Sequence, residues 1–362
     1  MGDSRTIQVI YEESSRKTAR TARSYTLDVC VSQDASQGHF FDVCGIRPLL
    51  ASALDGFSST CFAYGQTGSG KTYSLIGHES VIPKLDKKSS ELDGLLSRSV
   101  KFLFSAIKRR QEGNFDVFVS YYEVYNEQVR DVLNPSNNHL PIKWNPHQGF
   151  YVQNLSEVQC STKAEVMRYF CEGYKNTMIG THEMNQRSNR SHCIFTINVK
   201  CYKRVDDSED SSLSQICHGR VSFIDLAGSE RNKDTKANGK MLVESSQINK
   251  SLFTLGKVIH ALSKSSRKNS NFRVPYRDST LTKLLMHSLG GNSKTLMLAC
   301  CSPSAAHLSE SLRSLEFASR AKNIRNKPVV MLDAKESLIN ELRTEIGKLR
   351  VQNSTLKRSL KV

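Results

Sequence analysis

The chain of 362 residues has no long hydrophobic run and no stretch of low complexity. Its longest apolar run is Leu296–Cys301, which is far shorter than the roughly 20 apolar residues that a membrane helix requires. The polar start Met1–Arg5 does not have the pattern of a signal peptide. We therefore expect a soluble intracellular protein without a membrane partner.

The ten cysteines also lack a pattern, since no two of them have the C-x-x-C spacing typical of zinc and redox sites. Cys300 and Cys301 are adjacent, but they lie within the apolar run. The sequence therefore favours neither a disulfide framework nor a zinc site, and we expect reduced, mostly buried thiols.

Charge is distributed unevenly along the chain, which has 51 Lys and Arg, 35 Asp and Glu, and a net charge of +16. Residues 1–230 contain 26 basic and 26 acidic residues, whereas residues 231–362 contain 25 basic and 9 acidic ones. This asymmetry indicates a surface for an acidic polymer, either nucleic acid or an acidic protein. The length and the 38% hydrophobic residues fit one large domain or two ordinary ones.

Apolar segments that predict strands alternate with helical ones, which favours an α/β sheet. We expect strands at residues 60–64, 115–122, 193–202 and 220–225. The acidic segment Asp206–Asp210 lies between the last two and is interpreted as a solvated hairpin tip rather than a metal site.

Two segments have strong helical periodicity. In Gln247–Leu262 an apolar stripe faces the core, and Lys250, Lys257 and Lys264 recur every seven residues on the opposite side. Taken alone, these lysines fit an ordinary solvated face as well as a binding face.

From Ser337 onward, heptads place Ile and Asn at a positions and Leu at d positions, the pattern of a parallel two-stranded coiled coil. The alternative is a helix that folds back on its own domain.

A phosphate-binding loop follows the first expected strand. Residues 65–72 fit G-x-x-x-x-G-K-[ST], in which backbone N–H groups and a helix N-terminus bind phosphate oxygens. Lys71 would neutralise the β- and γ-phosphates and Thr72 would bind Mg²⁺. The expected nucleotide-binding residues are Gly65, Gln66, Thr67, Gly68, Ser69, Gly70, Lys71 and Thr72.

Two further segments have the properties of nucleotide-sensing switches. Asp225 to Gly228 follows a strand and offers a carboxylate for the magnesium shell and a backbone N–H for the γ-phosphate. The loop 185–192 is rich in short polar side chains. Each signal is weak alone, but in this order after a phosphate loop they predict a two-switch nucleoside triphosphatase.

Several short motifs follow one another in a fixed order, at residues 65–72, 185–192, 225–230, 248–252, 274–279, 288–291 and 317–322. In this respect residues 38–327 closely resemble the motor domain of the kinesin superfamily. The resemblance implies a P-loop motor fold, with a central mostly parallel sheet flanked by helices on both faces. It also implies ATP with Mg²⁺ and microtubules as partner, hence a cytoplasmic, cytoskeletal location. Residues 144–152 are similar to a subgroup of kinesins with an N-terminal motor.

The resemblance also implies roles for individual residues. Ser188 would hold the lytic water, Arg190 and Glu230 would form the ion pair that closes the switches, and Glu230 would relay the proton. Gly228 would contact the γ-phosphate. The implied magnesium ligands are Thr72, Asn189 and Asp225, of which Asn189 stands where kinesins have a serine.

In kinesins, the helix after the second switch lies against tubulin. Residues 235–294 contain 11 basic and 2 acidic residues, which makes the lysine face a predicted microtubule surface. The basic segment has no interleaved aromatic residues for base stacking, which argues against nucleic acid as the main partner. The expected microtubule contacts are Asn249, Lys250, Lys257, Lys264, Arg267, Lys268, Arg273, Arg277 and Lys283.

The expected organisation is a motor domain over residues 1–322, a neck linker over 323–333 and a neck coiled coil over 334–362 that joins two copies in a homodimer. A motor followed by linker and coil is the arrangement of plus-end-directed kinesins.

Kinesins usually begin with a strand that ends in R-x-R-P. No such segment is present here, and Arg47-Pro48 lies in a helix-like segment. We therefore expect the motor to lack its first strand and the base pocket of that strand.

These departures leave two further functions open. One is a non-motile microtubule-binding protein with a degenerate ATPase site, because an Asn carbonyl suits the strict geometry of Mg²⁺ less well than a serine hydroxyl. The other is a P-loop enzyme for a small molecule, against which the lysine face and the heptads argue.

Overall fold

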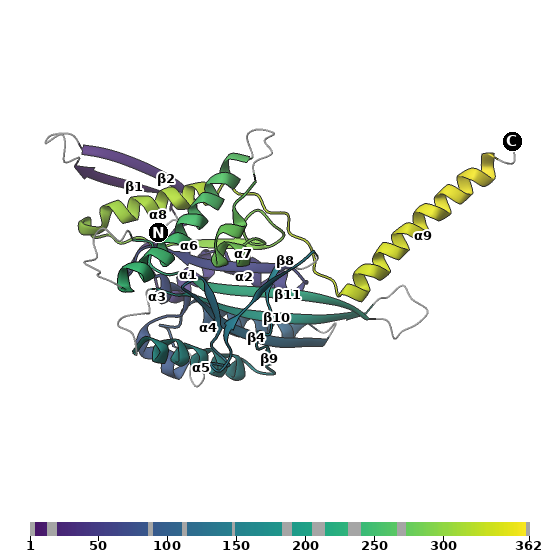
Figure 1. The fold of residues 1–362 in the computed structure, drawn as a ribbon, viewed down its shortest axis with the longest axis horizontal. Helices are drawn as coiled ribbons and strands as arrows, with labels where there is room; N and C mark the ends of the chain where they lie inside the picture. The colour runs from purple at the N-terminus through teal and green to yellow at the C-terminus, as the bar shows by residue number, and fades with distance from the viewer. Residues whose placement is uncertain are drawn as a thin grey trace.

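The computed structural model describes residues 4–12, 20–85, 90–110, 114–146, 149–182, 190–204, 214–230, 240–265 and 273–359. Among these residues the central feature is an eight-stranded sheet with the order β12-β3-β11-β10-β4-β5-β6, in which β9 pairs with β4 (Figure 1). Its strands are β3 (Ser58–Tyr64), β4 (Asn114–Tyr125), β5 (Gln128–Asp131), β6 (Asn138–Leu140), β9 (Val158–Gln159), β10 (His192–Arg204), β11 (Ser214–Asp225) and β12 (Lys294–Ala299). All four expected strands are therefore confirmed.

The sheet is mixed, and the expectation of a mostly parallel sheet is wrong. Among the described strand pairs, only β3–β11 and β3–β12 are parallel, whereas β10 is antiparallel to both β4 and β11. The connections between β10 and β11 and between β4 and β5 are too short for a parallel pair, which requires a crossover of a dozen or more residues, whereas β10 follows β4 only after a long connection that includes α5. Asn126 and Glu127 join β4 to β5 with φ of 50° and 62°, the two positive values of a type I′ hairpin turn.

Side chains of β3 alternate between two cores, one on each face of the sheet. Cys61 and Ala63 belong to one buried cluster, whereas Phe62 and Tyr64 belong to the other. This is the two-residue period of a strand that is covered on both faces. The strand places its C-terminal end, and the loop that follows, at the edge of both layers.

Helices cover both faces, as expected. The first cluster packs under α1 (Gln37–Val43), α2 (Ile46–Leu54), α4 (Leu95–Arg109) and α5 (Lys163–His182). The second packs under α6 (Lys240–Ser265), α7 (Thr280–Leu284) and part of α8 (Leu308–Ala321). Figure 1 shows α6 and α8 on the side of the sheet opposite to α5. Arg47-Pro48 lies in α2, as expected for a helical segment.

Two strand pairs stand apart from the central sheet. The strands β1 (Ser4–Glu12) and β2 (Arg20–Cys30) form one antiparallel pair, and β7 (Ile142–Asn145) and β8 (Gly149–Val152) form the other. Among the described strands β12 pairs with β3 alone and is therefore an edge of the central sheet.

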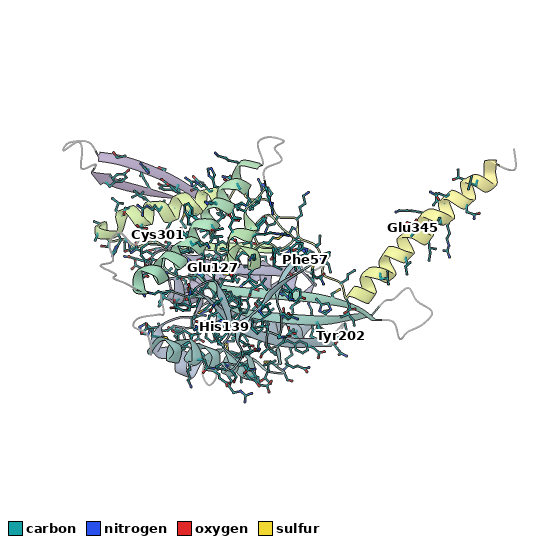
Figure 2. All side chains as sticks on the ribbon, viewed as in Figure 1. Phe57, Glu127, His139, Tyr202, Cys301 and Glu345 are labelled. Atoms are coloured by element: carbon teal, nitrogen blue, oxygen red, sulfur yellow. The ribbon has the colours of Figure 1, made fainter. Side chains whose placement is uncertain are left out.

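Both expected helices are present, and the first has the expected faces. In α6 the stripe formed by Leu252, Leu255 and Ile259 is buried, whereas Lys250 and Lys257 are exposed. The second, α9 (Ala334–Ser359), is a single helix that stands away from the sheet. Its side chains project from the helix around Glu345 with no neighbouring element beside them in Figure 2.

The ten cysteines are free, and six of them are buried. This confirms the expected thiols. No described helix combines the length and the apolar character needed to cross a membrane.

Candidate functional site

The phosphate-binding loop lies between β3 and α3 (Lys71–Leu75), at the C-terminal end of a parallel strand. Gly65 is tightly enclosed, because a Cβ atom there would lie 2.2 Å from the carbonyl oxygen of Cys300. Gly68 and Gly70 have φ of 74° and 97°, a backbone conformation that favours glycine. The backbone conformation of the loop therefore requires glycine at these positions. Such a loop can direct backbone N–H groups toward an anion.

Lys71 is buried beside the loop, with only 8% of its surface exposed. Its Nζ donates to the carbonyl oxygen of Gln66 at 2.9 Å. Burial lowers the pKa of Lys71, and the negative charges of Asp225 and Glu230 oppose this shift. A bound phosphate would add negative charge at a buried cation, which is the compensation that a nucleotide supplies.

Asp225 ends β11 beside the phosphate loop, where Thr72 donates a hydrogen bond to it. The distance from Thr72 Oγ1 to Asp225 Oδ2 is 2.5 Å, and Asp225 Oδ1 is buried without a hydrogen-bond partner. Burial raises the pKa of Asp225, while the Thr72 hydrogen bond and the charge of Lys71 lower it. An unsatisfied buried carboxylate oxygen next to a hydroxyl fits a site that holds Mg²⁺ through one carboxylate, with water and phosphate as the other ligands.

Glu230 is held by the phosphate loop. Its carboxylate accepts from Thr67 N at 2.9 Å and from Thr67 Oγ1 at 2.6 Å. Gly228 lies against both residues, since a Cβ atom there would be 2.4 Å from Thr67 Oγ1 and from the Glu230 carboxylate. Arg190 precedes β10 and is half-buried. Its ion pair with Glu230 stays a prediction, because the Glu230 carboxylate is hydrogen-bonded to Thr67.

Several expected site residues lie outside the described residues, namely Ser188, Asn189, Arg267 and Lys268. Asn249 lies in α6, where its backbone is described but its side chain is not. The roles implied for these residues therefore stay predictions.

The expected microtubule contacts that the structure describes include residues on α6 and Arg273. Lys250, Lys257 and Lys264 are exposed along α6. Phe253 is 64% exposed, and the Nζ atom of Lys257 lies over its ring, 4.6 Å from the ring centre. Arg273 is also exposed. These residues form a basic helix face with one large apolar side chain on it.

The strands β7 and β8 extend this surface. Arg277 is exposed and lies over the ring of Phe150 in β8, with its guanidinium carbon 5.9 Å from the ring centre. Trp144 in β7 is 46% exposed and borders a cavity of about 400 Å³ with Arg273 and Arg277. Lys283 is half-buried in α7.

The expected linker lies against the sheet through backbone hydrogen bonds. Met331 N donates to Gly56 O at 2.8 Å, and His218 N donates to Met331 O at 2.7 Å. Val330 and Leu332 form bridges with Phe57 and Cys217. The segment therefore runs along the ends of β3 and β11, the two strands that lead to the phosphate loop and to Asp225.

Three features of the site had escaped the sequence analysis. They are the bond from Thr67 to Glu230, a cavity of about 630 Å³ beside the phosphate loop, and the aromatic ring of Tyr73 in its wall. Tyr73 is 44% exposed on α3. An exposed aromatic residue one position after the loop motif was a signal available in the sequence, whereas the other two features depend on tertiary packing.

Comparisons with known proteins agree on one family. A family model described as "Kinesin motor domain" matches residues 3–324. The solved structure described as "Structure of a fast kinesin: Implications for ATPase mechanism and interactions with microtubules" is 37% identical to this chain. The two superpose with a TM-score of 0.75 over 86% of this chain and 83% of that chain.

Curated relatives are similar over most of this chain. "Kinesin-related protein 1" of Dictyostelium discoideum is 39% identical over 347 residues, which are 92% of this chain and 15% of that protein. "Kinesin-like protein KIF27" of Homo sapiens is 39% identical over 334 residues, 91% of this chain and 23% of that protein. "Chromosome-associated kinesin KIF4A" of Homo sapiens is 38% identical over 333 residues, 91% of this chain and 26% of that protein. The chain thus spans about a quarter or less of the length of these relatives.

Proposed function

The chain belongs to the kinesin motor family, and we propose that it couples ATP hydrolysis to plus-end-directed movement along microtubules. The observation that carries this proposal is the convergence of three segments on one phosphate loop. Thr72 donates to Asp225 at 2.5 Å, and Thr67 donates to Glu230 at 2.6 Å. A nucleotide in this loop would therefore contact both ends of the segment 225–230.

The proposed nucleotide is ATP with Mg²⁺. Backbone N–H groups of residues 65–72 and the Lys71 ammonium would bind the phosphates, while Thr72, Asp225 and Asn189 would hold the metal. When bound, Mg²⁺ neutralises charge that develops on the phosphate oxygens. The unsatisfied Asp225 Oδ1 supports this assignment.

For hydrolysis we propose the roles that the family implies. The Gly228 N–H would sense the γ-phosphate, Ser188 would position the water, and Glu230 would leave Thr67 to pair with Arg190 and accept the water's proton. Phosphoryl transfer depends mainly on positioning and charge compensation, for which this set of groups is suited.

The proposed track is the microtubule, bound by the exposed basic face of α6 and by Arg273 and Arg277. Such contacts act strongly on the encounter with an acidic polymer and weaken with salt. Asn249 would connect this face to the second switch.

Force output would pass from a motor domain over residues 1–322 through a neck linker over residues 323–333, of which residues 330–333 hydrogen-bond beside β3 and β11. Residues 334–362 would form a neck coiled coil between two copies. Leu342, Ile346, Leu349 and Leu356 of α9 are 48% to 63% exposed, so a second helix has an apolar stripe to cover. Movement toward the plus end follows from the order of motor, linker and coil by analogy.

A second candidate is a microtubule-binding protein with weak turnover, which Asn189 in place of the family's serine favours. Co-sedimentation with microtubules tests binding: we expect the protein to pellet without nucleotide and with a non-hydrolysable ATP analogue, and to be released by ADP. ATP turnover of the wild-type protein and of Asn189→Ser then separates the two candidates. A large gain in the variant favours the second candidate, whereas failure to pellet in any nucleotide state contradicts both.

A further inference from the structure

His192 is a buried histidine with hydrogen bonds on both ring nitrogens. It is the first residue of β10 and has 2% of its surface exposed. The backbone N–H of Ala227 donates to Nδ1 at 3.0 Å, and Nε2 lies 2.8 Å from Ser251 Oγ. One imidazole thus joins the segment after β11 to helix α6.

The geometry determines the proton position on this ring. A backbone N–H can only donate, so Nδ1 must be an unprotonated acceptor. A neutral ring then carries its hydrogen on Nε2 and donates it to Ser251. Burial and the positive charge of Lys71 lower the pKa of His192 to about 3, which keeps the ring neutral at physiological pH.

The three joined segments are those that a track-stimulated ATPase must connect. Ala227 precedes Gly228 and lies two residues after Asp225, while His192 follows Arg190 by two residues. On α6, Ser251 is 3% exposed and faces the core, whereas its neighbour Lys250 is exposed on the proposed track surface. A shift of α6 by a bound track would therefore move Ser251, and with it the His192 ring.

We propose that His192 is a positioning residue that transmits displacement of α6 to the segment 225–230. The proposal rests on the proposed function and adds to Asn249 a second connection between track and nucleotide, through the side chain of His192. The ring itself hydrogen-bonds to Ala227 and Ser251. These two hydrogen bonds keep the backbone of Ala227 at a fixed distance from α6. The N–H of Gly228 and the carboxylate of Glu230 therefore move with the helix.

Two substitutions cut the same hydrogen bond from opposite ends. Ser251→Ala removes the acceptor hydroxyl. His192→Asn places a carboxamide oxygen near the position of Nδ1, where it accepts from Ala227, but it does not reach Ser251. We expect each variant to lower the stimulation of ATP turnover by saturating microtubules about tenfold, the factor that corresponds to one buried hydrogen bond.

The double variant decides between coupling and ordinary core packing. If the bond carries the coupling, the double variant loses no more stimulation than either single variant. Effects that multiply in the double variant, or stimulation within about twofold of wild type in Ser251→Ala, overturn the proposal. The matched control is Thr254→Val, which removes another buried hydroxyl of α6 from a residue that does not hydrogen-bond to His192, and we expect it to retain stimulation.

A spectroscopic measurement tests the arrangement without any turnover and also covers the case in which His192→Asn fails to fold. In a ¹⁵N-histidine-labelled protein, we expect the Ser251→Ala-sensitive ring signal to show a neutral imidazole protonated at Nε2 at pH 7. A charged ring or an Nδ1–H tautomer would contradict the inference. Stimulation of the wild-type protein tests the proposed function separately, so the two failures are distinguishable.

Discussion

Thr67 donates two hydrogen bonds to Glu230, one from its backbone N–H and one from its hydroxyl, although the residues are 163 positions apart. The phosphate loop therefore holds the carboxylate that the proposed mechanism pairs with Arg190. If Glu230 must reach Arg190 before water is activated, this contact stabilises the resting arrangement.

Removing one of these bonds should release Glu230. We expect Thr67→Val to raise ATP turnover in the absence of microtubules by about tenfold or more, since hydrogen bonds to charged groups contribute about 1.5–3 kcal/mol. Thr67→Ser keeps the hydroxyl and should behave as wild type. Ser69→Ala is the matched control, because its hydroxyl donates to Gln66 O in the same loop and not to Glu230. Unchanged or reduced turnover in Thr67→Val would contradict the holding role.

Docking of the linker depends on Gly56, which has φ of 91°. A Cβ atom there would lie 2.8 Å from Cys217 Cβ and 2.9 Å from Val330 Cγ1. We expect Gly56→Ala to undock residues 330–332, measured as increased mobility of a spin label at Met331 and as slower microtubule gliding. Gly45→Ala is a close control, because Gly45 has φ of 86° but open space around its Cβ position. Both variants should lose about 1 kcal/mol of stability from backbone strain, and only Gly56→Ala should free the linker.

The proposed track surface contains both charged and apolar side chains, and the salt dependence of binding should distinguish their contributions. We expect Lys257→Ala to weaken microtubule binding strongly at low salt and less at high salt, because exposed charges are screened. Phe253→Ala should weaken microtubule binding to a similar degree at low and at high salt, since burial of an aromatic ring does not depend on ionic strength. Dissociation constants at two salt concentrations provide the measurement. Lys101→Ala, on α4 at the opposite face of the sheet, should change neither value.

Stability in acid should reflect His192. Histidine in an unfolded chain has a pKa of about 6.5, whereas that of folded His192 is lowered to about 3. Between these values the unfolded state binds a proton that the folded state does not, so the free energy of unfolding falls as pH drops below 6.5.

Urea unfolding at pH 7 and pH 5 measures this effect. We expect wild type to lose about 2 kcal/mol more than His192→Asn over this interval. The substitution of an exposed histidine, His260→Asn, should leave the wild-type pH dependence in place. An equal loss in wild type and His192→Asn would show that the buried ring does not contribute to acid sensitivity.

The sequence was sufficient for the features that depend on local pattern. The apolar run before Gly65 predicted β3, and the spacing of Leu252, Leu255 and Ile259 predicted the buried face of α6. The antiparallel direction of β10 relative to β4 and β11 was not predicted, because strand composition does not specify the direction of a strand.

Contacts between distant segments were also missed. The partners of Glu230 and His192 belong to other motifs of the chain, and nothing in the local sequence specifies them. The sequence indicated which residues carry the chemistry of phosphate binding, whereas tertiary packing decided which of them hold one another.

The most direct test of the central claim is the steady-state rate of ATP hydrolysis by the purified chain as a function of microtubule concentration. We predict a rate that rises to a plateau with microtubules and that is abolished, with and without them, in Lys71→Ala. A rate that is the same at every microtubule concentration would contradict the assignment as a microtubule-stimulated motor.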